Sequence, residues 1–351
     1  MSNNTRPATY SVSRLKTFHI CSMLYKYKYV DRIKVDSLTK ATLLGSCLHQ
    51  ILEDTYKPYI NLTNPPIALS SNLIIQGTIN TLTNAFVHDL TEQVNEVHKN
   101  YLLLAHLYKR ADEHYTGKDA IRKADGTVAQ APEMTGTWKR EVASYNLEDT
   151  KERLDSYIKS VDARWDTISF YELVMDVFKI AYKFTLDARI KKILATELEF
   201  SPETNVLITP FTGKDGPVLE AYIDLIVELD DGEVAIIDYK SSSQAYKEVD
   251  IDFNSQLHMY SYAYETFFKT KAKYIGIYNL RDNSLVVSRM QPIIRQEVLK
   301  QLVSAHTRIK NNKFEKRLPN RDVANACPCL DQFHKPCAYL ALCYPNLASK
   351  L

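Results

Sequence analysis

The strongest constraint on the fold lies after residue 193, where short apolar runs replace the long helical patterns that precede them. Two of these runs, "VLEAYIDLIVEL" and "EVAIIDYK", are joined by the turn "DDGE". Runs rich in Val and Ile on both sides of an Asp-Gly turn indicate a β-hairpin. The segment therefore predicts two neighbouring antiparallel strands.

The pattern around this hairpin indicates a layered fold of strands and helices. "LATELEF" and "NVLITPF" are typical of strands before it, and "KYIGIYNL" and "SLVVSRM" are typical of strands after it. Helical periodicity covers about 254–268 and 291–311. This order predicts an α/β layer in which helices pack on a mixed sheet.

The preceding residues predict a helical lobe. Helical patterns cover 11–30, 41–57, 68–110 and 146–193, and a polar stretch with turn signals separates the last two. Cysteines are concentrated after the last helix of the α/β layer. We therefore divide the chain into a helical lobe over 1–193, an α/β core over 194–311 and a cysteine-rich tail over 312–351.

Composition narrows the class of protein. Hydrophobic residues make up 45% and charged residues 25% of the 351, proportions that indicate an ordinary water-soluble globular protein. No apolar run is long enough to cross a bilayer and no signal-peptide pattern opens the sequence, so we expect a cytoplasmic protein with no membrane partner. The first forty residues carry eight Lys and Arg against two Asp, which favours a local contact with an anionic partner.

Three charged side chains lie at or near the ends of the hairpin strands. Asp224 interrupts one apolar run, and Asp238 and Lys240 close the next. Side chains two apart on a strand share a face, so Asp238 and Lys240 lie side by side, and the hairpin can bring Asp224 to them. Clustered carboxylates suit Mg²⁺ or Mn²⁺, an ion that activates water and neutralises charge on a scissile phosphate. The alternative is a surface ion pair without a catalytic role.

Further motifs surround these acids. "LLGSCLHQILE" contains Gly45 and His49, "TELEF" contains Glu197, and "NSQLHMYSYAYE" places Gln256 and Tyr260 four residues apart. In the order in which they occur, these motifs and the D-x-K strand end resemble the PD-(D/E)XK nuclease superfamily, and within it the RecB-type exonuclease branch. The N-terminal motif of that branch is matched by Ser11, Ser13, Leu15, Phe18, Cys21, Tyr25 and Tyr29. The chain departs from the family pattern at Ser22, where proline is usual, and at Ala221, where glycine is common.

The resemblance implies a restriction-endonuclease-like fold, in which helices flank a mixed sheet, with an N-terminal helical lobe and a C-terminal cysteine cluster. It implies that the catalytic metal is held by His49, Asp224, Asp238 and the carbonyl of Tyr239. The wider catalytic set is Asp224, Asp238, Lys240, Glu197, Gln256 and Tyr260, with Lys240 assisting the attacking water. Each of these residues also has a non-catalytic interpretation. His49 alone is typical of a core histidine and Glu197 of a solvated strand residue. Gln256 and Tyr260 could form one polar–aromatic stripe of a helix.

The six cysteines are unevenly placed. Nothing indicates secretion, so metal ligation is favoured over a disulfide framework. The resemblance implies a [4Fe-4S] cluster on Cys21, Cys329, Cys337 and Cys343, with Cys327 as the substitute for Cys329 because the spacing departs from the family pattern. Structural Zn²⁺ on these thiolates, or with His334 as a ligand, is the alternative. Cys47 is expected to be a small buried residue.

The expected function is that of a metal-dependent DNA exonuclease, which hydrolyses phosphodiester bonds in DNA ends or single strands during recombination, repair or phage DNA metabolism. The basic residues Arg14, Lys16, Lys26 and Lys28, together with "IRKADGTVAQ", are expected to contact DNA phosphates, and tyrosines to stack on bases. The sequence contains no helicase phosphate-binding motif, so a separate helicase or recombination protein is a candidate partner.

Two alternative functions remain. One is an endonuclease of the same fold, which could be sequence-specific, structure-specific or of the CRISPR-adaptation type. The other is a non-catalytic DNA-binding scaffold.

Overall fold

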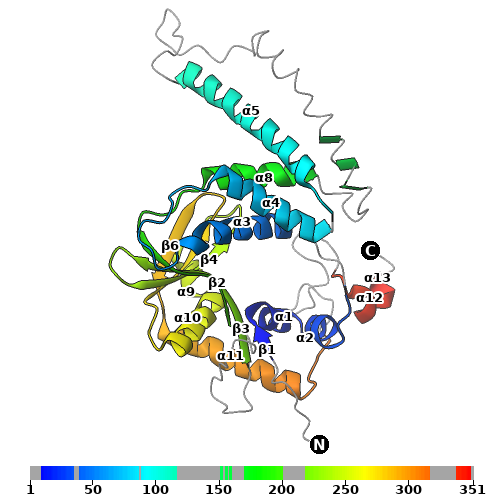
Figure 1. The fold of residues 1–351 in the computed structure, drawn as a ribbon. Helices are drawn as coiled ribbons and strands as arrows, with labels where there is room; N and C mark the ends of the chain where they lie inside the picture. The colour runs from blue at the N-terminus through cyan, green and yellow to red at the C-terminus, as the bar shows by residue number, and fades with distance from the viewer. Residues whose placement is uncertain are drawn as a thin grey trace, which may run out of the picture.

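A mixed β-sheet with helices on both faces forms the centre of the molecule (Figure 1). The computed structural model describes residues 9–34, 39–86, 88–116, 151–152, 155–156, 158–159, 170–200, 218–316 and 337–348. The predicted α/β class is confirmed, with the flanked mixed sheet of a restriction-endonuclease-like fold. Among the described residues, no helix has both the length and the apolar character needed to span a bilayer.

The elements occur in an order close to the prediction. The strands are β1 (Thr9–Ser11), β2 (Ile190–Phe200), β3 (Val218–Leu229), β4 (Val234–Lys240), β5 (Tyr274–Asn279) and β6 (Ser284–Arg289). The helices before β2 are α1 (Val12–Ile20), α2 (Ser22–Tyr25), the π-helix η1 (Lys26–Val30), α3 (Lys40–Tyr56), the 3₁₀-helix η2 (Lys57–Tyr59), α4 (Ser71–Phe86), α5 (Thr91–Thr116) and α8 (Phe170–Lys183). The later helices are α9 (Glu248–Asp252), α10 (Ser255–Phe268), α11 (Pro292–Lys310), α12 (Leu340–Cys343) and α13 (Pro345–Ala348).

The sheet is organised around β3, which pairs with three other strands. β4 pairs with it in antiparallel fashion through the predicted hairpin, β2 is also antiparallel to it, and β1 runs parallel to its first residues. β5 is parallel to β4, and β6 is antiparallel to β5. The hairpin turn uses Gly232 at φ +78°, a left-handed conformation that costs glycine little. The mixed sheet therefore carries the two acidic strands, β3 and β4, next to each other.

Two hydrophobic clusters hold helices against the two faces of the sheet. One cluster packs α3, α4 and α8 against Val227 and Ile237. The other packs α1, α10 and α11 against Ile226 and Ile236. Because successive strand residues point to opposite faces, β3 and β4 must be apolar at nearly every position to serve both clusters.

Two predicted helices are divided by local contacts. The helix predicted over 11–30 breaks at Cys21, whose backbone is extended and whose sulfur accepts the N–H of Leu24 at the start of α2. The helix predicted over 68–110 is two helices, α4 and α5. Asp89 lies before α5, and its carboxylate accepts the backbone N–H of Thr91 at 2.9 Å. A side-chain acceptor at a helix start satisfies an otherwise unpaired N–H group.

The sheet also extends into segments where no strand was expected. β2 begins at Ile190, inside the region predicted as helix up to 193, because Ile190 pairs with Leu229 of β3. The short strand β1 is too brief to leave a recognisable pattern in the sequence, and its pairing with β3 brings α1 against the α/β layer. The strand predicted from "NVLITPF" and the polar stretch with "IRKADGTVAQ" lie outside the described residues.

Gly77 allows α4 to pack closely on α3. A Cβ at this position would lie 2.7 Å from Ile51 Cγ1 and 3.3 Å from Ile51 Cα. We expect Gly77→Ala to lower the free energy of unfolding by about 1–3 kcal/mol, because overpacking displaces the neighbouring helix. The matched control is Gly45→Ala in α3, where a Cβ meets nothing within 4 Å and alanine favours the helix by about 1 kcal/mol. Denaturant unfolding measures both variants, and a Gly77→Ala protein as stable as Gly45→Ala would contradict this packing.

Candidate active site

Asp224 and Asp238 lie where β3 and β4 stop pairing. The last cross-strand pair before the strands diverge is Leu225 with Ile237, so the next position on each strand is one of the two aspartates. Beyond this point the Tyr239 N–H donates to Asp224 Oδ2 at 2.7 Å instead of to a backbone carbonyl of β3. Asp224 is 6% exposed and Asp238 1% exposed. The predicted convergence of the two acids is therefore present, at a buried position.

Asp238 is held by two neighbours that the sequence motifs named. Its Oδ2 forms an ion pair with the ammonium group of Lys240, which lies two residues further along β4 on the same face. Its Oδ1 accepts the amide N–H of Gln256 at 2.8 Å, and the same amide also donates to the hydroxyl of Tyr260 at 2.7 Å. Asn254 caps α10 and fixes Gln256 in its first turn. The D-x-K strand end and the Q-x-x-x-Y helix thus form one hydrogen-bonded unit.

His49 reaches the same place from α3, on the opposite face of the sheet. Its Nδ1 lies 3.2 Å from Glu197 Oε1, a hydrogen bond, and 3.8 Å from Asp224 Oδ1. Its ring meets the ring of Tyr239 edge-on, with centroids 5.6 Å apart. The buried face of α3, which includes Leu48 and Ile51, packs in the core and turns His49 toward the strands.

Glu197 enters the site through an unusual backbone conformation. It lies in the middle of β2, between two residues that pair with Leu225 and Ile223 of β3, and is therefore opposite Asp224. Its φ is +44°, a left-handed value that non-glycine residues seldom adopt. Such strain persists only where surrounding contacts enforce it, and it is concentrated at functional sites. No sequence pattern signals this conformation, because glutamate has no preference for it.

Burial and mutual repulsion weaken the ionisation of these acids. Burial first, and the charge of Asp238 second, raise the pKa of Asp224 to about 7. Burial also raises the pKa of Asp238, although Lys240 opposes this effect. Burial lowers the pKa of His49, but Glu197 and the two aspartates outweigh it, so that its pKa is raised. A bound cation would favour the ionised carboxylates and so lower their pKa values again.

The donor set fits a divalent cation. One ligand atom each from His49, Glu197 and Asp224 lies within 4.8 Å of the others. Two carboxylates and an imidazole suit Mn²⁺ or Mg²⁺, ions that keep bound waters as further ligands. This group includes Glu197, which sequence analysis expected as a catalytic residue but not as a metal ligand. The oxygens of Asp238 are instead engaged by Lys240 and Gln256, next to the group.

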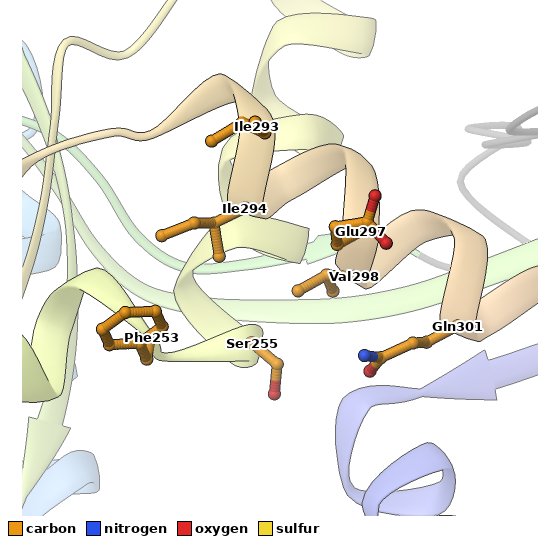
Figure 2. A pocket seen from close by; sticks show the side chains of 7 residues that line it. All are labelled: Phe253, Ser255, Ile293, Ile294, Glu297, Val298 and Gln301. Atoms are coloured by element: carbon orange, nitrogen blue, oxygen red, sulfur yellow. The ribbon is translucent and has the colours of Figure 1, made fainter.

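Two clefts lie on either side of the first turn of α10. One, of about 310 Å³, is called the polar cleft because most of its lining residues are of polar type; they are Ser11, Val12, Ser13, Lys16, Glu220, Ala221, Tyr222, Gln256 and Tyr260. The other, of about 470 Å³, is shown in Figure 2 and is lined by Phe253, Ser255, Ile293, Ile294, Glu297, Val298 and Gln301. Only the polar cleft includes side chains of the candidate site. Of its other residues, sequence analysis predicted a role for Lys16 alone.

The basic residues expected to contact DNA lie on or near α1 and η1. Arg14 pairs with Glu220 at 3.6 Å, and Lys26 pairs with Asp31 at 2.6 Å. Lys28 lies over the ring of Tyr29, as Arg14 does. Lys16 lines the polar cleft. Only Lys16 therefore lies directly beside the candidate site residues.

The cysteines at the two ends of the chain come near the same tyrosine. Tyr27 of η1 stacks on Tyr339, with ring centroids 5.8 Å apart, and the Tyr339 hydroxyl donates to the carbonyl of Ile33. Burial, with the nearby side chains of Cys343 and Cys21, raises the pKa of Tyr27 to about 12. The C-terminal segment thus packs against the segment that follows Cys21.

The remaining cysteines divide between the described and undescribed parts of the chain. Cys337 begins the C-terminal segment and is partly exposed. Cys327, Cys329 and His334 lie outside the described residues. Cys47 is fully buried in the cluster around α3, as expected of a small core residue.

Asp224 should make the stability of the metal-free protein fall as the pH rises. Its folded-state pKa of about 7 lies above the unfolded value of about 3.9, so between these values only the folded state keeps the proton. We expect Asp224→Asn to flatten this dependence and, at pH 8, to raise the free energy of unfolding by at least about 1 kcal/mol. Thermal unfolding from pH 5 to 8, with and without Mn²⁺, measures this. Asp230→Asn in the exposed hairpin turn is the control, and a profile shared by both variants would contradict the assignment.

Comparisons with known proteins identify the family of the chain. No curated protein matches the chain. Among solved structures, a protein from Eubacterium rectale described as a "Putative exonuclease" matches at 13% identity and a TM-score of 0.35, over 95% of this chain and 92% of that chain. A model of the PD-(D/E)XK nuclease superfamily matches residues 9–344. Because this match covers most of the sequence, the chain belongs to the PD-(D/E)XK nuclease superfamily.

Proposed function

We propose that this protein is a metal-dependent DNA exonuclease of the RecB-type branch, acting on free ends or single strands. The observation that carries the proposal is the cluster of His49, Glu197 and Asp224 beside the Asp238–Lys240 pair. A non-catalytic scaffold has no need for buried carboxylates of raised pKa, which cost stability unless a cation neutralises them. The order of the sequence motifs supports the RecB-type branch, and the family supports DNA as substrate.

The proposed roles combine what the family resemblance implies with the contacts of the side chains. His49, Asp224, Asp238 and the Tyr239 carbonyl would hold Mg²⁺ or Mn²⁺, with Glu197 completing the group. A divalent cation supplies Lewis-acid stabilisation of phosphoryl charge and lowers the pKa of water. Lys240 would orient the attacking water and stabilise negative charge on the phosphate. Gln256 and Tyr260 would keep Asp238 in place through their shared hydrogen bonds.

A [4Fe-4S] cluster on Cys21, Cys337, Cys343 and Cys329 would join the two ends of the chain, with Cys327 as the substitute for Cys329. The packing of Tyr27 near both Cys21 and Cys343 supports this assignment, because ligands from both ends must meet. Four thiolates suit iron–sulfur clusters as well as zinc, so the metal content decides between them.

The proposed setting is DNA recombination, repair or phage DNA metabolism, with a separate helicase or recombination protein as partner. The exposed face of α1 and η1, with Lys16 and Lys28, would meet the DNA backbone, and nearby tyrosines would stack on bases. An endonuclease of the same fold is the main rival, since it would use the same metal site.

Exonuclease action requires a DNA end. With Mn²⁺ or Mg²⁺, we expect the purified protein to degrade linear DNA and to leave covalently closed circles of the same sequence intact. Lys240→Ala should lower the rate by about 10²-fold or more, because it removes stabilisation of transition-state charge. Lys271→Ala, an exposed lysine beyond the far end of α10, is the matched control. Degradation of circles as fast as linear DNA would favour the endonuclease, and full activity of Lys240→Ala would refute the site.

The cluster has a separate readout. Protein purified without air should be brown and contain about four iron and four sulfide per chain. Cys343→Ser should lose the colour and most of the iron, whereas Cys47→Ala should keep both. Colourless protein with zinc and no iron would replace the cluster by a structural zinc site.

A further inference from the structure

The polar cleft beside the candidate site has walls from two distant parts of the chain. One wall is Gln256 and Tyr260 of α10, and Gln256 also donates to Asp238. The facing wall is the junction of β1 and α1, where Ser11 and Ser13 place their hydroxyl oxygens 2.9 Å apart. A single side chain, Gln256, therefore separates this cleft from the carboxylate of Asp238. A group bound in the cleft would lie one side chain away from Asp238, which is next to the candidate metal ligands.

Among the described residues, the charges that line the cleft leave one cation without an ion-pair partner. Glu220 is paired with Arg14 at 3.6 Å, and the Tyr222 hydroxyl donates to Glu199. Lys16 also lines the cleft, it is exposed, and its ammonium group has no ion pair with any residue in the described ranges. An unpaired ammonium near serine hydroxyls favours an anion with several acceptor oxygens.

The cleft shown in Figure 2 provides a contrast. Phe253 and Ile293 there are each 71% exposed, and Glu297 is its only charged side chain. Glu297 is paired with Lys300 at 2.6 Å, and no lysine or arginine lines this cleft, so a phosphate bound there would have no cationic lining side chain to pair with. Of the two clefts, only the polar one matches an anion.

We propose that the polar cleft binds the backbone phosphate of the nucleotide adjacent to the scissile phosphate, through Lys16 and Ser13. This inference rests on the proposed nuclease function and assigns Lys16, already expected on the DNA backbone, to one phosphate as a substrate-positioning residue. The charge and hydroxyls of the cleft recognise the phosphodiester itself, so the contact is independent of base identity. Its consequence is that the strand passes between α1 and the first turn of α10, and that one phosphate is fixed while its neighbour lies at the metal site.

Binding without chemistry tests the contact. With EDTA present, a labelled single-stranded oligonucleotide should bind Lys16→Gln about tenfold more weakly than wild type, and Lys16→Arg close to wild type. The slope of log affinity against log salt should fall by about 0.7 in Lys16→Gln, because one phosphate contact is lost. Lys271→Ala should match wild type in both measurements. Lys16 is exposed, and equal melting temperatures would show that the variants are folded.

A neutral linkage locates the contact. A methylphosphonate placed next to the cleavage position should weaken binding to wild type by about as much as Lys16→Gln does, and should not weaken Lys16→Gln further. Penalties that add fully in the variant, or wild-type affinity of Lys16→Gln, would overturn the inference. Wild-type protein that binds the oligonucleotide but does not cleave it with Mn²⁺ would refute the proposed function instead. Wild-type protein that does not bind it would overturn both.

Discussion

The hydrogen bond from the Tyr239 N–H to Asp224 lies where β3 and β4 separate, and the geometry of the candidate site depends on it. A strand that leaves its partner exposes backbone donors, which must be satisfied when they are buried. Asp224 satisfies one of them, while β4 continues in parallel pairing with β5. The same divergence leaves Asp238 without a partner on β3, and its carboxylate contacts Gln256 and Lys240. The pairing of β3 with β4 thus places the two buried aspartates at neighbouring positions, and these side-chain contacts hold their carboxylates.

Side chains from both faces of the sheet complete this arrangement. His49 belongs to α3 in one hydrophobic cluster, and Gln256 belongs to α10, which packs in the other. Each cluster fixes the position of its own helix. The positions of His49 and Gln256 are therefore set by the packing of apolar residues and not by their own polar contacts. The backbone of Glu197 is strained at φ +44°. The packing of the two hydrophobic clusters must compensate for the free energy of this strain. A protein that concentrates charge in this way gives up stability for a site that a cation can occupy.

The N-terminal segment connects the site to the far end of the chain. β1 and α1 join the α/β layer and form a wall of the polar cleft. Immediately after them, Cys21 begins α2, and Tyr27 of η1 packs on Tyr339 near the C-terminus. Ser22 adds a second link, because its hydroxyl accepts the N–H of Glu315 at 2.9 Å. The contacts of the C-terminal segment with η1 are therefore separated from the cleft wall only by α1 and α2.

Local sequence patterns predict the α/β class, the hairpin and the pairing of Asp238 with Lys240, and the family resemblance adds His49, Glu197, Gln256 and Tyr260. Strand alternation placed Asp238 beside Lys240, and helical spacing placed Gln256 beside Tyr260. Features that depend on contacts between distant segments are visible only in the tertiary structure. The pairing of β1 with β3, the left-handed backbone of Glu197 and the polar cleft with Lys16 are of this kind. No local pattern encodes them, because each exists only once the two cores have packed and drawn remote parts of the chain together.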